Sequence, residues 1–337
     1  MGYAKLNFAT TVTTAQAMYD IVRCLNGTNT STANLIYANT ANSEIVNTLN
    51  ENWSVLYGNV ADTTTAYVVT SPCVTASKTH RVKLQMGNGS SWDTSAAFTT
   101  TGAGIGLNTI ETATSATSVT NPTFYSTSTG ANGMGRYLIK TDATNTSIYI
   151  HWSAKHILFY GLSSNAVGTM YMGSFEYPET SLTQYTNTAP VIQYNNTYTA
   201  NTTYVTTTTV GTDTTLGIIF QGIKIYTPNN NTTNGVYHIP TGGFGTVPVT
   251  DFDAVQTIDA TGNNVYPIVP FYWSNPAIGL PIMNISELTG VYRMSRVASV
   301  PEGLFTSGAD TYVWLPLAST INGGVGLTQA GIALLKK

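Results

Sequence analysis

Charged side chains are scarce in this sequence. It has 13 Lys and Arg and 16 Asp and Glu among 337 residues, so charged residues make up 9% of the chain, whereas ordinary soluble proteins contain about 25%. The net charge is −3 and no cluster of Lys or Arg occurs. Binding to nucleic acid requires basic groups that neutralise phosphates. We therefore expect no nucleic-acid partner.

Long apolar runs and cysteines are also lacking. No run of about 18 apolar residues occurs, so we expect no membrane-spanning helix and no membrane partner. Residues Met1–Leu6 lack the basic-then-apolar layout of a signal peptide, which favours synthesis in a reducing cytoplasm. The two cysteines, Cys24 and Cys73, cannot form a disulfide framework and match no zinc spacing. We expect both to be buried structural residues.

Residues with catalytic chemistry form no recognisable constellation. A nucleophilic enzyme needs Ser or Cys beside a positioned base, and no Gly-x-Ser-x-Gly motif occurs. The sixteen acidic residues offer no pair that stands out as the two carboxyls of a glycosidase. The chain has four histidines: His80, His151, His156 and His238. We assign no catalytic residue and expect a protein that is not an enzyme.

Metal and cofactor sites are not indicated either. His151 and His156 are five positions apart. On a regular strand they would face opposite sides and could not share a metal without a bulge. Asp251, Asp253 and Asp259 could chelate calcium, but they lack the Gly and downstream Glu of an EF-hand. Solvated turn carboxylates are the favoured interpretation. We assign no metal ligand.

One glycine-rich segment imitates a nucleotide-binding loop. Gly102-Ala103-Gly104-Ile105-Gly106 lies between Thr-rich segments. It has neither a clear preceding strand nor a following helix, which a phosphate-binding loop requires. We assign no cofactor-binding residue and expect no cofactor.

A helical pattern is confined to the N-terminal part of the chain. Apolar residues recur at helical spacing in Ala15–Leu25, with Thr13 or Thr14 as a cap and Asn26-Gly27 as a stop. A second, weaker helix is predicted over Ser43–Leu49.

After Trp53 the apolar pattern changes to the period of two that is typical of strands. The main predicted strands are Trp53–Tyr57, Ala66–Val69, His80–Met86, Ser147–Tyr160, Tyr171–Tyr177, Leu216–Phe220, Gly235–Ile239, Gly290–Met294 and Thr311–Leu315. We expect the last two of these to pair with each other. The pattern predicts a mainly β fold, with β-sandwich or barrel-like regions and a short helical N-terminal segment.

Composition along the chain indicates four segments. These are a helical N-terminal segment (1–52), a first β region (53–182), a Thr/Asn-rich arm or connection (183–215) and a second β region (216–337). Within the first β region, Thr99–Gly133 is rich in Thr, Ser and Gly. We expect it to be an extended surface excursion.

The composition also indicates what kind of surface the protein has. Tyr, Asn, Ser, Thr and Gly make adaptable contact surfaces of low charge, and charge depletion with aromatic enrichment is typical of interface cores. A protein that is largely interface would have this composition. A glycan-binding protein, whose Trp and Tyr stack on sugar rings, would have it too.

Several segments, in their order along the chain, resemble virion structural proteins of large tailed bacteriophages, chiefly myovirus relatives. The central match is Ser147–Phe159, a strand with a basic residue and a His near its end, followed by the Gly-bounded Gly168–Tyr177. The other matching segments are a short N-terminal helix, Trp53–Tyr57, a strand into Ser71-Pro72, Lys78–Leu84, Gly290–Met294 and Tyr312–Leu315. The matched segments cover about a third of the chain.

The sequence departs from this pattern at two places. Pro178-Glu179-Thr180 follows Glu176-Tyr177, where the phage proteins tend to have a basic residue and an acid. The Thr-rich segment Thr183–Thr215 has no counterpart in the pattern.

The resemblance implies a particle component assembled in many copies, but it does not distinguish a position on the tail, baseplate, neck or head. Among these positions we favour the tail or baseplate. Its partners would be other virion proteins and copies of itself, and it would reside in the virion after synthesis in the host bacterial cytoplasm. Alternatives are a receptor- or glycan-binding module of a fibre or baseplate, with a host-surface glycan or receptor as partner, a capsid decoration protein and a polysaccharide-degrading tail enzyme.

The tryptophans distinguish the structural role from glycan binding. An exposed Trp92, Trp152, Trp273 or Trp314 in a shallow groove would favour glycan binding. Buried tryptophans would favour the structural role.

Overall fold

The computed structural model describes part of the chain. The described residues are 1–61, 63, 66–75, 78–88, 93–97, 103–110, 112–120, 146–154, 156–162, 166–174, 191–199, 223–226, 236–237, 257–258, 264–265, 268–270, 290–295, 302–316 and 330–337. Over these residues the protein is mainly β, with antiparallel sheets and one α-helix. This confirms the predicted fold class, while its division into sandwich or barrel regions stays a prediction.

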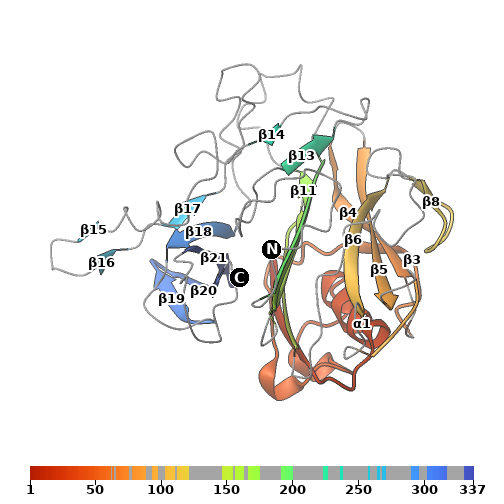
Figure 1. The fold of residues 1–337 in the computed structure, drawn as a ribbon, viewed down its shortest axis with the longest axis horizontal. Coiled ribbons are helices and arrows are strands. Elements are labelled where there is room, and N and C mark those ends of the chain that lie inside the picture. Colours follow the sequence, from red (N-terminus) through yellow and green to blue (C-terminus); the bar gives the residue numbers. More distant parts are fainter. Residues whose placement is uncertain are drawn as a thin grey trace.

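The largest sheet has eight strands, all paired antiparallel (Figure 1). In spatial order they are β14 (Val236–Tyr237), β13 (Ile223–Tyr226), β12 (Val191–Thr199), β11 (Ala166–Ser174), β10 (His156–Leu162), β9 (Thr146–Trp152), β1 (Gly2–Phe8) and β2 (Glu44–Asn47). Strands from all four predicted segments therefore belong to this one sheet. The segment boundaries themselves stay a prediction.

A helix and a second sheet lie on one side of the eight-stranded sheet (Figure 1). The four-stranded sheet has the order β3 (Ser54–Tyr57), β4 (Ala66–Thr75), β5 (Lys78–Asn88) and β6 (Ala103–Ile110). Helix α1 (Thr14–Leu25) contacts β1 of the large sheet and β5 and β6 of the smaller one. The helix thus lies between the two sheets.

A five-stranded sheet, called here the C-terminal sheet, lies on the opposite side of the eight-stranded sheet from α1 (Figure 1). Its order is β17 (Ile268–Pro270), β18 (Val291–Ser295), β21 (Ala330–Leu335), β20 (Asp310–Pro316) and β19 (Leu304–Ser307). The remaining described elements are the strand pairs β7 (Thr112–Ala113) with β8 (Val119–Thr120) and β15 (Thr257–Ile258) with β16 (Asn264–Val265), and the 3-10 helices η1 (Thr32–Asn34) and η2 (Thr40–Asn42).

Helix α1 forms where the apolar spacing predicts it, and its caps are local. Thr13 and Gln16 make a capping box, in which each side chain accepts a hydrogen bond from the other residue's backbone N–H. Asn26 ends the helix, and Gly27 follows with a positive φ of 75°. The predicted helix and its Thr13 cap are confirmed.

A buried carboxylate organises the segment that follows the helix. Asp20 accepts backbone hydrogen bonds from Ile36, Tyr37 and Ala38 at 3.1, 2.8 and 2.8 Å. A buried charge is tolerated only when it is hydrogen-bonded, and these donors satisfy it. The loop is thereby held against the helix.

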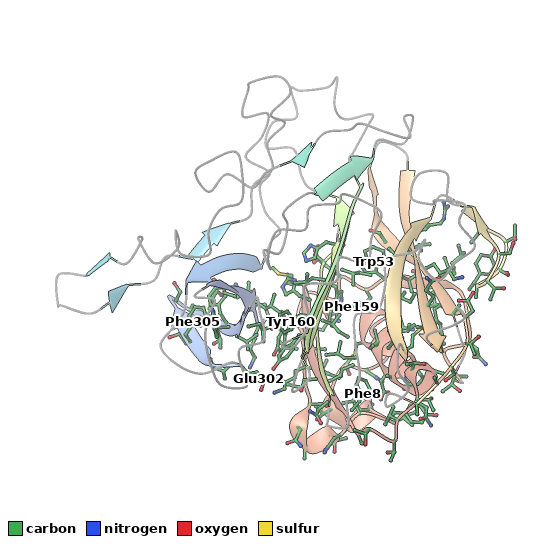
Figure 2. All side chains as sticks on the ribbon, viewed as in Figure 1. Phe8, Trp53, Phe159, Tyr160, Glu302 and Phe305 are labelled. Carbon is green, nitrogen blue, oxygen red and sulfur yellow. The ribbon has the colours of Figure 1, made fainter. Side chains whose placement is uncertain are left out.

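The main apolar core lies between the eight-stranded sheet and the four-stranded sheet, around α1. Because side chains alternate along a strand, one face of β1, β9 and β10 supplies this core. Its residues from these strands are Ala4, Leu6, Phe8, Ile148, Ile150, Trp152, Ile157 and Phe159. Figure 2 shows Phe8, Phe159 and Trp53 on this side of the sheet. We call it the apolar face.

The second predicted helix, over Ser43–Leu49, is wrong. Residues Glu44–Asn47 form strand β2, which pairs with β1 in the eight-stranded sheet. A short apolar run does not distinguish a helix from a strand. Here backbone pairing with the edge of a sheet decides the outcome.

The prediction that Thr99–Gly133 is an extended surface excursion is wrong for residues Ala103–Ile110. Residues Ala103–Ile110 form β6, which pairs with β5 along its whole length, and Ile105 is fully buried in the core. Gly104 and Gly106 occupy the positions between the apolar residues, so the segment resembles a loop in sequence although it is a strand.

Other predicted strands are found with shifted bounds or different partners. Gly290–Met294 and Thr311–Leu315 overlap β18 and β20, but β21 lies between them, so the predicted pairing of the two is wrong. Within the Thr/Asn-rich segment 183–215, β12 pairs with β11. The predicted strand Leu216–Phe220 lies outside the described residues.

Candidate functional site

The face of the eight-stranded sheet that is turned toward the C-terminal sheet carries polar and ionisable side chains. The register places His151 of β9 beside Tyr3 of β1 and Leu158 of β10, and places Tyr149 beside Lys5 and Tyr160. Figure 2 shows Tyr160 on the opposite side of the sheet from Phe159. We call this the polar face.

A pair of buried histidines lies at one end of the polar face. The rings of His151 and His156 stack at a centroid distance of 5.2 Å and an angle of 9°. His151 Nδ1 lies 3.0 Å from His156 Nε2, and His156 Nδ1 lies 2.9 Å from Ser153 Oγ. The three side chains therefore form a continuous hydrogen-bonded line, Ser153–His156–His151.

The prediction that His151 and His156 face opposite sides is wrong. The prediction treated Ser147–Tyr160 as a regular strand, whereas the chain reverses between β9 and β10. His151 and His156 then lie on adjacent antiparallel strands with their side chains on one face. The length of the segment is a signal of this reversal, because the 14 residues of Ser147–Tyr160 exceed the usual strand length of about 5–6 residues.

The environment of the pair favours neutral imidazoles. Both rings are buried, and burial lowers the pKa of His156 to about 3. Burial also lowers the pKa of His151 well below its ordinary value, and a charge on His156 would lower it further. His151 Nε2 is a buried nitrogen without a hydrogen-bond partner.

Gly290, next to β18 of the C-terminal sheet, covers that unpartnered nitrogen. A Cβ placed on Gly290 would lie 2.5 Å from His151 Nε2 and 2.7 Å from Met1 Sδ. Its φ of +89° is also a conformation that glycine adopts readily. Any side chain at position 290 would therefore clash with His151, and glycine leaves room for the imidazole.

The turn that carries Ser153 is fixed from the other side of the sheet. The Trp53 indole N–H donates to the Ser153 carbonyl at 2.8 Å, and the Ser71 hydroxyl donates to the carbonyl of Ala154. Both donors belong to the region of the four-stranded sheet. These bonds hold the β9–β10 turn, and with it the spacing of the two histidines.

A second polar contact joins the C-terminal sheet to the polar face. The Tyr149 hydroxyl donates to Glu302 Oε1, and Lys5 Nζ lies 2.9 Å from the same oxygen. Lys5 Nζ also lies 5.5 Å from the centroid of the Tyr149 ring. Burial and the Glu302 charge raise the pKa of Tyr149, so its hydroxyl stays a donor. Figure 2 shows Glu302 and Tyr160 between the two sheets.

A third contact between the C-terminal sheet and the eight-stranded sheet lies at the end of β21. Lys336 Nζ is 2.6 Å from Glu44 Oε1 and 5.6 Å from the centroid of the Tyr3 ring. Beside it, a small apolar cluster contains Met1, Tyr312, Trp314, Ala333 and Leu335. The junction between the sheets therefore combines a minor apolar contact with ion pairs, tyrosines and the histidine pair.

The Ser153–His156–His151 line has the order of a nucleophile, a base and an orienting group. However, Ser153 is only 8% exposed and both imidazoles are buried, so the three groups have little access to solvent. The prediction that the chain is not an enzyme stays a prediction.

The other candidate residues lie elsewhere in the fold or outside its described part. Cys24 is fully buried in α1 with a free thiol, as predicted, and burial raises its pKa. Cys73 lies in β4 and His80 in β5, with side chains outside the described set. Gly104 and Gly106 lie in a strand, not in a phosphate-binding loop. Asp251, Asp253, Asp259 and His238 lie outside the described residues.

Two further features are absent from the described part of the chain. No group of three or more His, Cys, Asp or Glu in this part of the chain is arranged to hold a metal ion. No helix in the described part has the length and apolar character needed to cross a membrane.

All the described tryptophans are buried. Trp53, Trp152 and Trp314 have exposed fractions of 1%, 0% and 5%, whereas Trp92 and Trp273 lie outside the described residues. Many described tyrosines are buried too, namely Tyr3, Tyr19, Tyr67, Tyr149, Tyr160 and Tyr312. In the described part of the chain, the aromatic enrichment mainly fills the interior.

Comparisons with known proteins give no relative from which a role could be transferred. No protein-family model matches the sequence, and no curated protein matches it significantly.

Proposed function

We propose that this chain is a structural component of a tailed-phage virion that assembles in multiple copies, with the tail or baseplate as its favoured position. The observation that carries the proposal is the burial of Trp53, Trp152 and Trp314. A glycan-binding surface would present such rings to solvent, where they stack on sugars. Here they pack inside the chain and serve its own fold.

The use of the few charges supports the same role. Every charged side chain in the described set has an intramolecular polar or ring contact. The ion pairs are Met1 ammonium–Glu51, Lys5–Glu302, Lys83–Asp93, Lys336–Glu44 and Lys337–Asp310. Among the described side chains, then, little unpaired charge remains to repel a second copy, and the net charge of the whole chain is only −3. Net charge is what ordinarily keeps proteins apart in solution.

Exposed apolar side chains offer contact points to neighbouring copies or proteins. Ile36, Leu49, Leu56 and Leu304 are all at least 45% exposed. Leu304 lies on β19, the edge strand of the C-terminal sheet. Uncharged edge strands are natural templates for pairing with another chain.

Mass spectrometry of purified virus particles tests the proposal. Particles are isolated by density gradient from a culture in which the chain is produced, and peptides are quantified against those of a major capsid protein. We expect peptides of this chain at many copies per particle. If the chain is present in the lysate but absent from the particles, the proposal is wrong.

Sedimentation velocity of the purified chain tests the assembly step. We expect association that grows with concentration, and poor solubility at high concentration. A monodisperse monomer at high concentration would contradict assembly through self-contact. A glycan array run on the same sample separates the alternative, because specific glycan binding would favour the receptor-binding role.

A further inference from the structure

Strand β19 forms one edge of the C-terminal sheet, where it pairs with β20 (Figure 1). In the described part of the chain, no strand pairs with the other side of β19. Leu304, Thr306 and Ser307 are exposed to solvent. Phe305 is half-buried, with its ring centroid 5.2 Å from that of Tyr312. This edge is therefore open to a further strand.

Three other edge strands of the described sheets carry features that discourage pairing with another chain. Strand β2 has the charged Glu44, which is held by Lys336, and β17 has Pro270, which lacks a backbone N–H. Strand β3 has an irregular register against β4 between Val55 and Tyr57. The sequence of β19 is Leu-Phe-Thr-Ser, which contains neither a charge nor a proline. Of these four edges, β19 is the one without such a feature.

The register of β19 against β20 determines which backbone groups of β19 face the open side. The Trp314 N–H donates to the Gly303 carbonyl at 3.0 Å. Because every second residue of an antiparallel strand bonds to the same neighbour, Phe305 also directs its backbone groups toward β20. Leu304 and Thr306 direct their N–H and C=O groups to the open side. These are the groups to which a further strand would bond.

One face of the C-terminal sheet carries an apolar row that ends at this edge. The register places Val313 of β20 beside Leu304 on one side and beside Leu334 of β21 on the other. Val313 and Leu334 are 2% and 0% exposed, whereas Leu304 is 63% exposed. A further strand beside β19 would cover Leu304 as its neighbours in the row are covered, and this would remove apolar surface from water.

We propose that β19 pairs antiparallel with β19 of a second copy across a two-fold axis, which joins the two C-terminal sheets into one continuous sheet. The inference names one contact of the assembly in multiple copies proposed above, and it rests on that proposal. Two-fold contacts, in which the same surface of each copy meets itself, are the commonest in homo-oligomers.

The charges around β19 favour a second copy over a charged partner. The strand itself has no charge, and the charged residues beyond its two ends are paired within the chain. These pairs are Glu302 with Lys5 and Asp310 with Lys337. A charged strand would therefore find no counter-charge along β19. A copy of β19 brings no charge and presents the same apolar and hydroxyl side chains.

Strand geometry determines how the two copies are aligned. Residues directly opposite each other share a face and a bonding direction, so a slip of one residue is excluded. With Leu304 opposite Thr306 of the second copy, Phe305 lies opposite its own counterpart on the two-fold axis, and each Leu304 is covered. A slip of two residues would place Leu304 opposite Gly308, which has no side chain to cover it. The opposite slip would leave most of β19 unpaired.

The contact is small. Two strands of four residues bury much less than the roughly 1,600 Å² of a standard stable interface. We therefore expect the contact to be weak between two free copies and to be strengthened by neighbouring contacts in an assembly. A covalent trap is the suitable test, because it captures a weak contact and also reports the alignment of the strands.

Disulfide trapping in the full chain, at a concentration where sedimentation velocity detects association, tests the inference. Phe305→Cys places two thiols on the axis, where Cα atoms of opposite residues are about 4.5 Å apart and a disulfide can form. Leu304→Cys and Thr306→Cys are the matched controls, because each residue is about 8 Å from its own counterpart. The wild type is the blank for Cys24 and Cys73. Mass spectrometry of the linked peptides identifies the bond.

We expect at least about ten-fold more disulfide-linked dimer from Phe305→Cys than from either control alone. Combining the Leu304→Cys and Thr306→Cys chains should give a mixed disulfide. Equal linking at all three positions, or no linking at residue 305 while the chain associates, would overturn the inference and leave the proposed assembly to other contacts. A chain that stays monomeric would contradict both the assembly and this contact.

Leu304→Lys keeps the test decisive if Phe305→Cys fails to fold. Because Leu304 is exposed, a charge there should spare the fold, which circular dichroism checks, but it would lie against the second copy. We expect association to weaken by at least about ten-fold. Leu49→Lys is the matched control, since Leu49 is 57% exposed and lies outside β19, and it should associate like the wild type. Unchanged association in Leu304→Lys, or equal weakening in both variants, would overturn the inference.

Discussion

The two faces of the eight-stranded sheet use alternate residues of the same strands, yet they make different kinds of contact. On β10, Phe159 packs into the apolar core around α1, whereas its neighbour Tyr160 lies on the polar face under the C-terminal sheet (Figure 2). On β1, Leu6 and Lys5 divide in the same way. Strand alternation thus separates a contact made by apolar burial from one made by ionisable groups.

This difference predicts how each contact responds to its surroundings. Apolar burial depends on the area removed from water and does not depend on protonation. Ion pairs and buried histidines change with pH and salt. We therefore expect the apolar face to hold the fold together, and the polar face to hold a part that can be released separately.

The largest effect is expected from Phe159→Ala on the apolar face. Removing this fully buried ring should lower the free energy of unfolding by about 4 kcal/mol. Urea denaturation followed by circular dichroism measures the loss. The matched change on the polar face is Tyr149→Phe, which keeps the ring and loses the hydroxyl bond to Glu302. It should cost about 1–2 kcal/mol, and equal costs would contradict the comparison.

A smaller effect is expected from Gly2→Ala on β1. Gly2 is paired with Trp152, and a Cβ there would lie 2.1 Å from the indole ring. The ring must move within a packed core, so we expect a loss of about 2 kcal/mol. Thermal unfolding measures it.

Gly308→Ala is the control for this change. A Cβ on Gly308 meets nothing within 4 Å, and only its φ of +62° opposes substitution. We expect a loss of about 1 kcal/mol. If Gly2→Ala is no more costly than this control, Trp152 does not pack on β1 as described.

Small effects on stability are expected from changes at two ion pairs, first from Glu302→Gln. It weakens the ion pair with Lys5 and the hydrogen bond from Tyr149, both partly screened by solvent, so we expect about 1 kcal/mol. The loss should shrink in 1 M salt, which denaturation in both buffers would show. Asp310→Asn breaks the more exposed Lys337 pair and should change stability by less than about 0.5 kcal/mol.

The sequence predicts the apolar face better than the polar one, for a physical reason. Periodicity is a local signal, so α1 and the alternation of β9 were found directly from it. The residues that complete the polar contact, Gly290 and Glu302, are more than 130 positions from the β9 side chains that they meet. Such long-range contacts leave no periodic signal in the sequence.

Native-state hydrogen exchange in increasing urea at pH 7.5 tests the difference between the two faces most directly. It follows amides of α1 for the apolar contact and amides of β20 and β21 for the polar one. We predict that β20 and β21 lose protection at lower urea, while α1 stays protected until the global transition. A single transition shared by all these amides would contradict the claim that the two contacts are separable.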